Sequence, residues 1–361
     1  MVGLILTVLV GSTAGCKPNE EALTRDDATS ANQLPDRAGS PPRPPIAGTG
    51  PTLLPDPRII NVHEHLMKSS LLAGYGRACE AVGIAATVFL GSSGYTLHGG
   101  RSGFDEHHIN NEFLCSLARI DPQRVYAWVT FNPQQDDMVP QLEKYLAQGA
   151  TGVKLYLGHT AKLGNGDPFH CMELDDPRMI PLYDFCSARR IPILAHINAG
   201  RFREEFERLL DRYPDLPWII PHYMVLGHRL ERLSEVLDRY PGVMVDQSFG
   251  TTAVAVSGLK RISQRRDEYR EFYIRYQDRI LFGTDAVITA ARYKTVDYLT
   301  RSFMAYRHML EFDEYVIDIE GRQGETWQAT LRGMHLPESV VRKIYRENFV
   351  RLCEESALPS L

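Results

Sequence analysis

Short apolar runs alternate with longer amphipathic segments from about residue 58 onward, and this alternation constrains the fold more than any other feature. We expect strands at 58–62, 84–90, 124–131, 151–156, 191–196, 218–222, 243–246 and 280–282. Runs of this length are typical of strands buried on both faces of a parallel sheet. The intervening segments have helical periodicity, as in 201–210, where Phe202, Phe206 and Leu209 share one face. Strands and helices in this order predict an α/β fold, the (β/α)₈ TIM barrel.

A doubly wound open sheet has the same local pattern and is the main rival. No Gly-x-Gly-x-x-Gly follows the first apolar run, which removes the usual reason to prefer a dinucleotide-binding fold. The formal net charge of −5 also gives no reason to expect a nucleic-acid partner, because such proteins usually carry a basic excess on one face.

The first residues differ in kind from the rest. Leu4–Val10 is apolar but too short to cross a bilayer, which takes roughly 20 residues. It fits the central region of a secretory signal peptide, and the small residues before Cys16 resemble a bacterial lipobox. We therefore expect residues 1–16 to be a signal peptide, with lipidation at Cys16 and a lipid-anchored location in the cell envelope. A periplasmic or secreted protein is the first alternative, and a cytoplasmic protein with a mis-assigned start is the second.

Residues 17–57 are rich in Pro, Ser, Asp, Asn and Gly and lack apolar periodicity. Such a composition cannot bury a face, so it predicts a disordered leader that tethers the barrel, residues 58–361, to its anchor.

Polar residues gather where the expected strands end. The first, fifth, sixth and eighth strands end at His63 and His65, His196, His222 and Asp285, respectively. Working residues of such barrels lie at the carboxyl ends of strands. Residues two apart on a strand point the same way, so His63 and His65 can bind one ion while Glu64 points away. Each residue alone is more simply a rim histidine or a helix cap, but their coincidence at one rim predicts a metal centre.

This order of HxH, His, His and Asp resembles the signature of the amidohydrolase superfamily. The nearest resemblance is to the amidohydrolase 2 branch, which includes aminocarboxymuconate-semialdehyde decarboxylase and related hydrolases. The matching stretches are 61–66, 152–155, 191–196, 209–217 running into His222, 239–246, 279–285 and 344–352.

The resemblance implies one divalent metal, with Zn²⁺ favoured over manganese or iron. His63, His65 and His196 would bind it, and Asp285 would be a further ligand and proton shuttle. His222 would stand beside the metal and hold or protonate the substrate or the attacking water.

Two basic residues have several interpretations. Lys154 lies on the fourth expected strand, where some relatives carry a carbamylated lysine that bridges a second metal. It could equally bind a substrate carboxylate or be structural. Arg201, in the loop after His196, is a candidate for anion recognition or a solvated helix start. Tyr223-Met224-Val225 replaces the Leu-Gly-Gly usual in the family, and we expect this loop to line the site.

The favoured function is hydrolysis of an amide, ester or lactone in a small molecule. Bound zinc lowers the pKa of water from 15.7 to about 7. Asp285 would serve as base and then acid, and His222 would donate to the oxyanion.

A non-oxidative decarboxylase of a small unsaturated or aromatic acid is the alternative function, and a non-catalytic metal-binding lipoprotein is the third. The expected partner is a small-molecule substrate; membrane contact would come only through the anchor, and a homo-oligomer is left open.

Overall fold

The computed structural model describes residues 48–49, 53–98, 103–160, 172–322 and 324–356. The predicted signal peptide, Cys16 and most of the predicted tether lie outside these ranges. No helix in the described ranges has the length and apolarity needed to cross a membrane.

An eight-stranded parallel sheet forms the centre of the molecule, with its strands in chain order. The strands are β2 (Ile59–Glu64), β3 (Ile84–Leu90), β4 (Val125–Thr130), β5 (Ala150–Gly158), β6 (Ile193–Ile197), β7 (Trp218–Ile220), β8 (Val243–Asp246) and β9 (Ile280–Leu281). Backbone bonds from Val62 N–H to Phe282 O (2.9 Å) and from Asp285 N–H to His63 O (2.8 Å) bring the last strand against the first. The predicted (β/α)₈ barrel is therefore confirmed.

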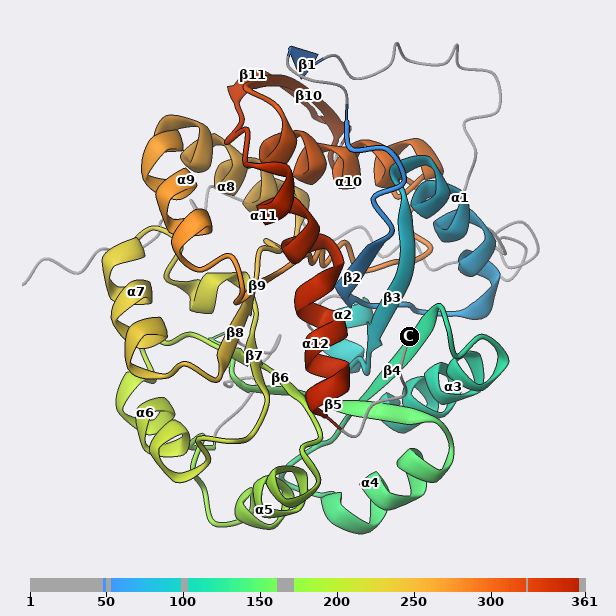
Figure 1. The fold of residues 1–361 in the computed structure, drawn as a ribbon. Helices are drawn as coiled ribbons and strands as arrows, with labels where there is room; N and C mark the ends of the chain where they lie inside the picture. The colour runs from blue at the N-terminus through green and yellow to red at the C-terminus, as the bar shows by residue number, and fades with distance from the viewer. Residues whose placement is uncertain (1–47, 50–52, 99–102, 161–171, 323, 357–361) are drawn as a thin grey trace, which may run out of the picture.

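Helices surround this sheet (Figure 1). They include α1 (Leu72–Val82), α2 (Gly94–His98), α3 (His107–Ile120), α4 (Met138–Ala147), α5 (Ile180–Arg189), α6 (Arg203–Arg212), α7 (Leu230–Arg239), α8 (Thr252–Gln264), α9 (Arg266–Arg275) and α10 (Val296–Glu311). The longer helices bury an apolar stripe; in α7 this stripe is Leu230, Leu233, Val236 and Leu237. Four cysteines, Cys79, Cys115, Cys186 and Cys353, lie buried and unpaired in helices.

The inside of the barrel is a packed apolar core that includes Val88, Trp128 and Leu194. Gly152 makes room for this packing, since a Cβ there would lie 2.6 Å from the Trp128 indole. The C-terminal α12 (Asn348–Glu355) adds Phe349 and Leu352 to the same core. In Figure 1 this helix crosses the middle of the barrel. Asn348 Nδ2 donates to Gln277 O and Ile280 O at the start of β9, so the helix covers the end opposite the strands' carboxyl ends.

After β9 the chain forms two further elements, a helix and a hairpin. Helix α10 packs Tyr298, Phe303 and Met309 into the core. It is followed by a hairpin, β10 (Glu314–Glu320) and β11 (Thr326–Arg332), which was not expected. With β1 (Gly48–Thr49) the hairpin forms a separate antiparallel sheet of three strands.

Candidate metal centre

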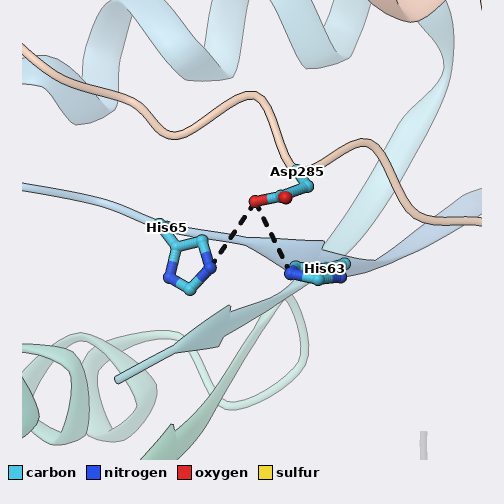
Figure 2. Close-up of side chains that lie close together, drawn as sticks. All are labelled: His63, His65 and Asp285. Atoms are coloured by element: carbon cyan, nitrogen blue, oxygen red, sulfur yellow. Dashed lines mark ion pairs between the residues drawn. The ribbon is translucent and has the colours of Figure 1, made fainter. Parts of the chain in front are cut away.

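Three imidazoles face one carboxylate at the carboxyl end of the barrel. The Nε2 atoms of His63 and His65 each lie 3.5 Å from Asp285 Oδ1, and Figure 2 shows both rings turned toward it. His222 Nε2 lies 3.6 Å from Asp285 Oδ2. His63 is on β2, His65 directly follows it, and Asp285 follows β9. His222 begins the short 3-10 helix η3 (His222–Val225) after β7.

The other ring nitrogen of each histidine is already engaged. His63 Nδ1 lies 2.6 Å from Asp246 Oδ2, His65 Nδ1 lies 3.2 Å from Leu90 O, and His222 Nδ1 lies 3.1 Å from Ser248 O. Carbonyls and carboxylates only accept hydrogen bonds, so Nδ1 carries the proton in each ring. The neutral rings therefore present Nε2 lone pairs toward Asp285, which is the arrangement of metal-binding histidines.

Burial favours the neutral, ligand-competent form of these rings. It lowers the pKa of His63 to about 3, although nearby Asp246 acts in the opposite direction. Burial also holds the pKa of His65 well below its ordinary value and lowers that of His222. Asp285 is buried too, and this raises its pKa well above the ordinary value, against the effect of Lys154. A cation among these groups would compensate the buried carboxylate.

The spacing of the ligand atoms fits a divalent ion. Ligand atoms of His63, His65 and Asp285 all lie within 4.8 Å of one another, as do those of His63, His222 and Asp246. The 3.5 Å separations are too long for good hydrogen bonds. A tetrahedral ion with bonds of about 2.0–2.2 Å holds neighbouring ligand atoms roughly 3.3–3.6 Å apart. Imidazole nitrogen and carboxylate oxygen are also a donor set that suits zinc.

His196 stands apart from the predicted ligand set. Its ring stacks on His159 with 4.2 Å between centroids, and its centroid lies 5.0 Å from that of His222. Within the described residues, neither group of converging ligand atoms includes it. The structure thus brings together three of the four predicted ligands, and His222 Nε2, which was not among those four, approaches the same carboxylate.

Lys154 lies inside the barrel mouth with an exposed fraction of 1%. Burial lowers its pKa to about 8, while Asp285 and Asp246 act to raise it. Its Nζ lies 4.7 Å from the centre of the Tyr156 ring. Arg201, in contrast, is exposed before α6, with its guanidinium 5.6 Å from the Phe202 ring centre.

The loop after His222 was expected to line the site, but the side chain of Tyr223 packs against helix α9 instead. Tyr223 and Met224 are buried, and the Tyr223 hydroxyl bonds that of Tyr273 on α9 at 2.5 Å. The residues from His222 to Val225 all have φ between 54° and 57°. Left-handed backbone is rare for residues other than glycine, and it turns the Tyr223 side chain into the helical layer.

Sequence reasoning missed two residues of this site. Asp246 bonds His63, and its place at the end of β8 matches that of the residues that were selected. Glu64 was set aside because it points away from His63 and His65. It is buried and bonds the loop that carries Asp285. No local sequence signal marks this contact, since it depends on two strands at opposite ends of the chain.

Comparison with known proteins agrees with this architecture. A family model described as Amidohydrolase matches residues 80–352. No curated protein matches the sequence. Among solved structures, an uncharacterised TIM-barrel protein from Bordetella bronchiseptica is 16% identical with a TM-score of 0.54, covering 83% of this chain and 99% of that one.

Two further structures are similar in fold. A probable 2-pyrone-4,6-dicarboxylic acid hydrolase from Acinetobacter baumannii, with citric acid bound, is 12% identical with a TM-score of 0.52, covering 82% of this chain and 98% of that one. A 4-oxalomesaconate hydratase from Rhodopseudomonas palustris is 15% identical with a TM-score of 0.50, covering 82% and 96%. At these identities the similarity shows a shared fold.

Proposed function

This chain belongs to the amidohydrolase family, whose members are metal-dependent enzymes acting on small molecules, and from that membership we propose that it is a hydrolase of an amide, ester or lactone. The convergence of His63, His65 and His222 Nε2 on the Asp285 carboxylate carries the proposal. One divalent ion, Zn²⁺ by preference, would be held there by His63, His65 and Asp285, with His196 or His222 as a further ligand.

The bound ion would supply a water molecule that ionises near neutral pH. Asp285 would accept a proton from the attacking water and return it to the leaving group, as a general base and then acid. His222 donates Nδ1–H to Ser248, so its Nε2 can accept a proton or bind metal. It can donate to an oxyanion only after it has taken up a proton.

Lys154 would bind an anionic substrate. Its buried ammonium would pair with a carboxylate or a developing oxyanion without competition from bulk water. Carbamylation of Lys154 would instead create a bridge to a second ion. Metal content separates the two roles, since one equivalent per chain supports substrate binding and two support the bridge.

The test is a chromatographic screen of the zinc-loaded protein against lactones, esters, amides and carboxylated aromatic acids. We expect a lactone, ester or amide to be consumed, with ¹⁸O from labelled water in the product. His63→Ala should abolish both turnover and metal retention while the barrel stays folded by circular dichroism. Full metal content in His63→Ala would contradict the assignment.

A non-oxidative decarboxylase is the second candidate, and the buried ammonium of Lys154 favours it by offering a site for a carboxylate. Carbon dioxide release without incorporation of labelled oxygen would select this candidate over the hydrolase.

We also propose that lipidated Cys16 anchors the enzyme to the cell envelope. Cys16→Ala should move the protein from the membrane fraction to the soluble fraction without changing its activity. Continued sedimentation with membranes would contradict the anchor.

A further inference from the structure

The loop that carries Asp285 has an unusual backbone. Asp285 and Val287 have φ of 50° and 52°, in the left-handed region. This region is disfavoured for residues with a Cβ, and for a β-branched residue such as Val287 it is a genuine outlier. Such conformations persist only where surrounding contacts enforce them.

Glu64 supplies contacts to the N–H groups of this loop. It is fully buried, and its carboxylate accepts hydrogen bonds from Val287 N–H at 2.8 Å, Ala286 N–H at 3.3 Å and the Thr284 hydroxyl at 2.7 Å. It also accepts from His65 N–H at 3.1 Å. An ionised carboxylate has about four acceptor sites, so these four donors fill it.

Lys294 supplies contacts to the carbonyl groups of the same loop. Lys294 is 7% exposed, and its Nζ donates to Ala286 O at 2.6 Å and to Val287 O. The N–H and C=O groups of Ala286 and Val287 are therefore all bound by one buried anion and one buried cation. A carboxylate and an ammonium are costly to bury, and apolar replacements of buried ion pairs are often as stable. The two charges thus need an explanation other than stability.

We propose that Glu64 and Lys294 are a pair of positioning residues that hold the 284–287 loop with Asp285 and Val287 in the left-handed region, so that the Asp285 carboxylate faces the histidine nitrogens. The inference rests on the proposed function, in which Asp285 is a ligand and proton acceptor. Glu64 does not touch the ion or the substrate; it acts through Asp285.

Hydrogen exchange of the metal-free protein tests the contact itself. Glu64→Gln replaces an acceptor with an amide donor, so we expect Ala286 and Val287 to exchange about tenfold faster or more, as for loss of a hydrogen bond to a charged group. Lys294→Met should also speed exchange in this loop, and Lys294→Arg should restore part of the protection. Unchanged exchange in both Glu64→Gln and Lys294→Met would overturn the proposal.

A double-mutant cycle tests whether the pair acts through Asp285. Zinc affinity is measured by competition with a chromogenic chelator in the wild type, Glu64→Gln, Asp285→Asn and the double variant. Glu64→Gln should weaken zinc binding about tenfold, as for loss of a residue that orients a ligand. In the Asp285→Asn background, Glu64→Gln should cause no further loss of zinc affinity. A general structural defect would give the same loss in both backgrounds, and that result would contradict a positioning role.

These measurements distinguish failure of the Asp285 ligand assignment from failure of the Glu64–Lys294 positioning role. If Asp285→Asn alone leaves zinc affinity unchanged, the ligand assignment in the proposed function fails, while the exchange data still decide whether the loop is held. If Glu64→Gln does not fold, Lys294→Met takes its place in the cycle. Glu112→Gln and Lys144→Met are matched controls, because this Glu–Lys pair is about half exposed with a 3.0 Å contact, and neither change should alter zinc affinity.

Discussion

Asp246 fixes the orientation of two histidines with one buried carboxylate. Its Oδ2 accepts from His63 Nδ1 at 2.6 Å, and its Oδ1 accepts from the backbone N–H of His222 at 3.1 Å. Oδ1 also accepts from the Ser248 hydroxyl. Although burial alone would raise it, the pKa of Asp246 is far below its ordinary value, chiefly through its attraction to His63. It therefore stays ionised and determines which nitrogen of His63 is free for a ligand.

Asp246→Asn should lower zinc affinity by about 10–100-fold, because an amide no longer holds His63 in the Nδ1–H tautomer. Chelator competition measures the affinity, and circular dichroism checks the fold. Wild-type affinity in this variant would show that the Asp246 contact does not orient a metal ligand.

A second pair, His107 and Asp136, predicts a pH dependence of stability away from the metal centre. Their Nε2 and Oδ2 atoms lie 2.8 Å apart. Although burial opposes both shifts, the contact raises the pKa of His107 and lowers that of Asp136. The histidine stabilises the folded state fully at a pH below the pKa of about 6.5 that it has in the unfolded chain. This stabilisation is lost as the pH rises through the higher pKa of the folded state. The aspartate stabilises the folded state fully at a pH above the pKa of about 3.9 that it has in the unfolded chain. This stabilisation is lost as the pH falls through the lower pKa of the folded state.

Asp136→Asn should therefore cost the most stability between about pH 4 and pH 6.5, by about 1–3 kcal/mol, as for a hydrogen bond to a charged group. The loss of free energy of unfolding relative to the wild type should become smaller as the pH is raised above neutrality. Urea unfolding of both proteins at pH 5.5 and pH 9 measures this. A deficit that grows with pH would reverse the assigned direction of the shifts.

At the level of elements, sequence periodicity predicted every strand of the barrel but placed several ends wrongly. β6 begins at Ile193 and β7 ends at Ile220, which leaves Pro192 and Pro221 outside the strands. Proline cannot donate to a strand ladder, and this was readable in the sequence. The hairpin was missed although Tyr315, Ile317 and Ile319 alternate with partly exposed residues, as in a half-buried strand.

Strand order was enough to predict which residues lie at the rim of the barrel that holds the candidate site. His63, His65, His222 and Asp285 were selected because each lies at or just after the end of a strand, and these strand ends meet at one rim. Which of them converge depends on register and ring orientation, which no local pattern contains. The absence of His196 from the converging ligand atoms and the contacts of Asp246 and Glu64 are therefore visible only in the three-dimensional structure.

The pairing of β4 and β5 depends on one glycine. A Cβ at Gly152 would overlap the Trp128 indole, so Gly152→Ala should destabilise the barrel by about 1–3 kcal/mol through overpacking. Gly76→Ala is the matched control with the opposite sign. Its Cβ would meet nothing within 4 Å, and alanine in the helix α1 gains about 1 kcal/mol over glycine. Equal urea midpoints for the two variants would contradict the packing account.

On the scale of the whole molecule, the metal centre lies where the two ends of the sheet meet. The bonds Asp285 N–H to His63 O and Ile288 N–H to His65 O join the β9 region to β2 beside the ligands. The buried side-chain bond between Asn61 and Thr284 spans 223 positions. An ion at this place would therefore connect the first and last parts of the barrel.

Zinc should accordingly stabilise the whole fold. At a free concentration about 100 times its Kd, it should add about 2.7 kcal/mol to the free energy of unfolding. Calorimetry with zinc and with EDTA measures the change in Tm, and His63→Ala should remove it. An equal zinc-dependent shift in His63→Ala would place the binding elsewhere.

The meeting of β2 and β9 also has a consequence for biosynthesis. A ribosome releases His63 and His65 early, but their aspartate partner follows only after most of the polypeptide has been made. A truncated translation product that stops before residue 280 would contain His63 and His65 but would lack Asp285 and the contact between β2 and β9. If Asp285 is a ligand, as proposed, metal would be loaded only after the chain is nearly complete, because incomplete chains lack this carboxylate.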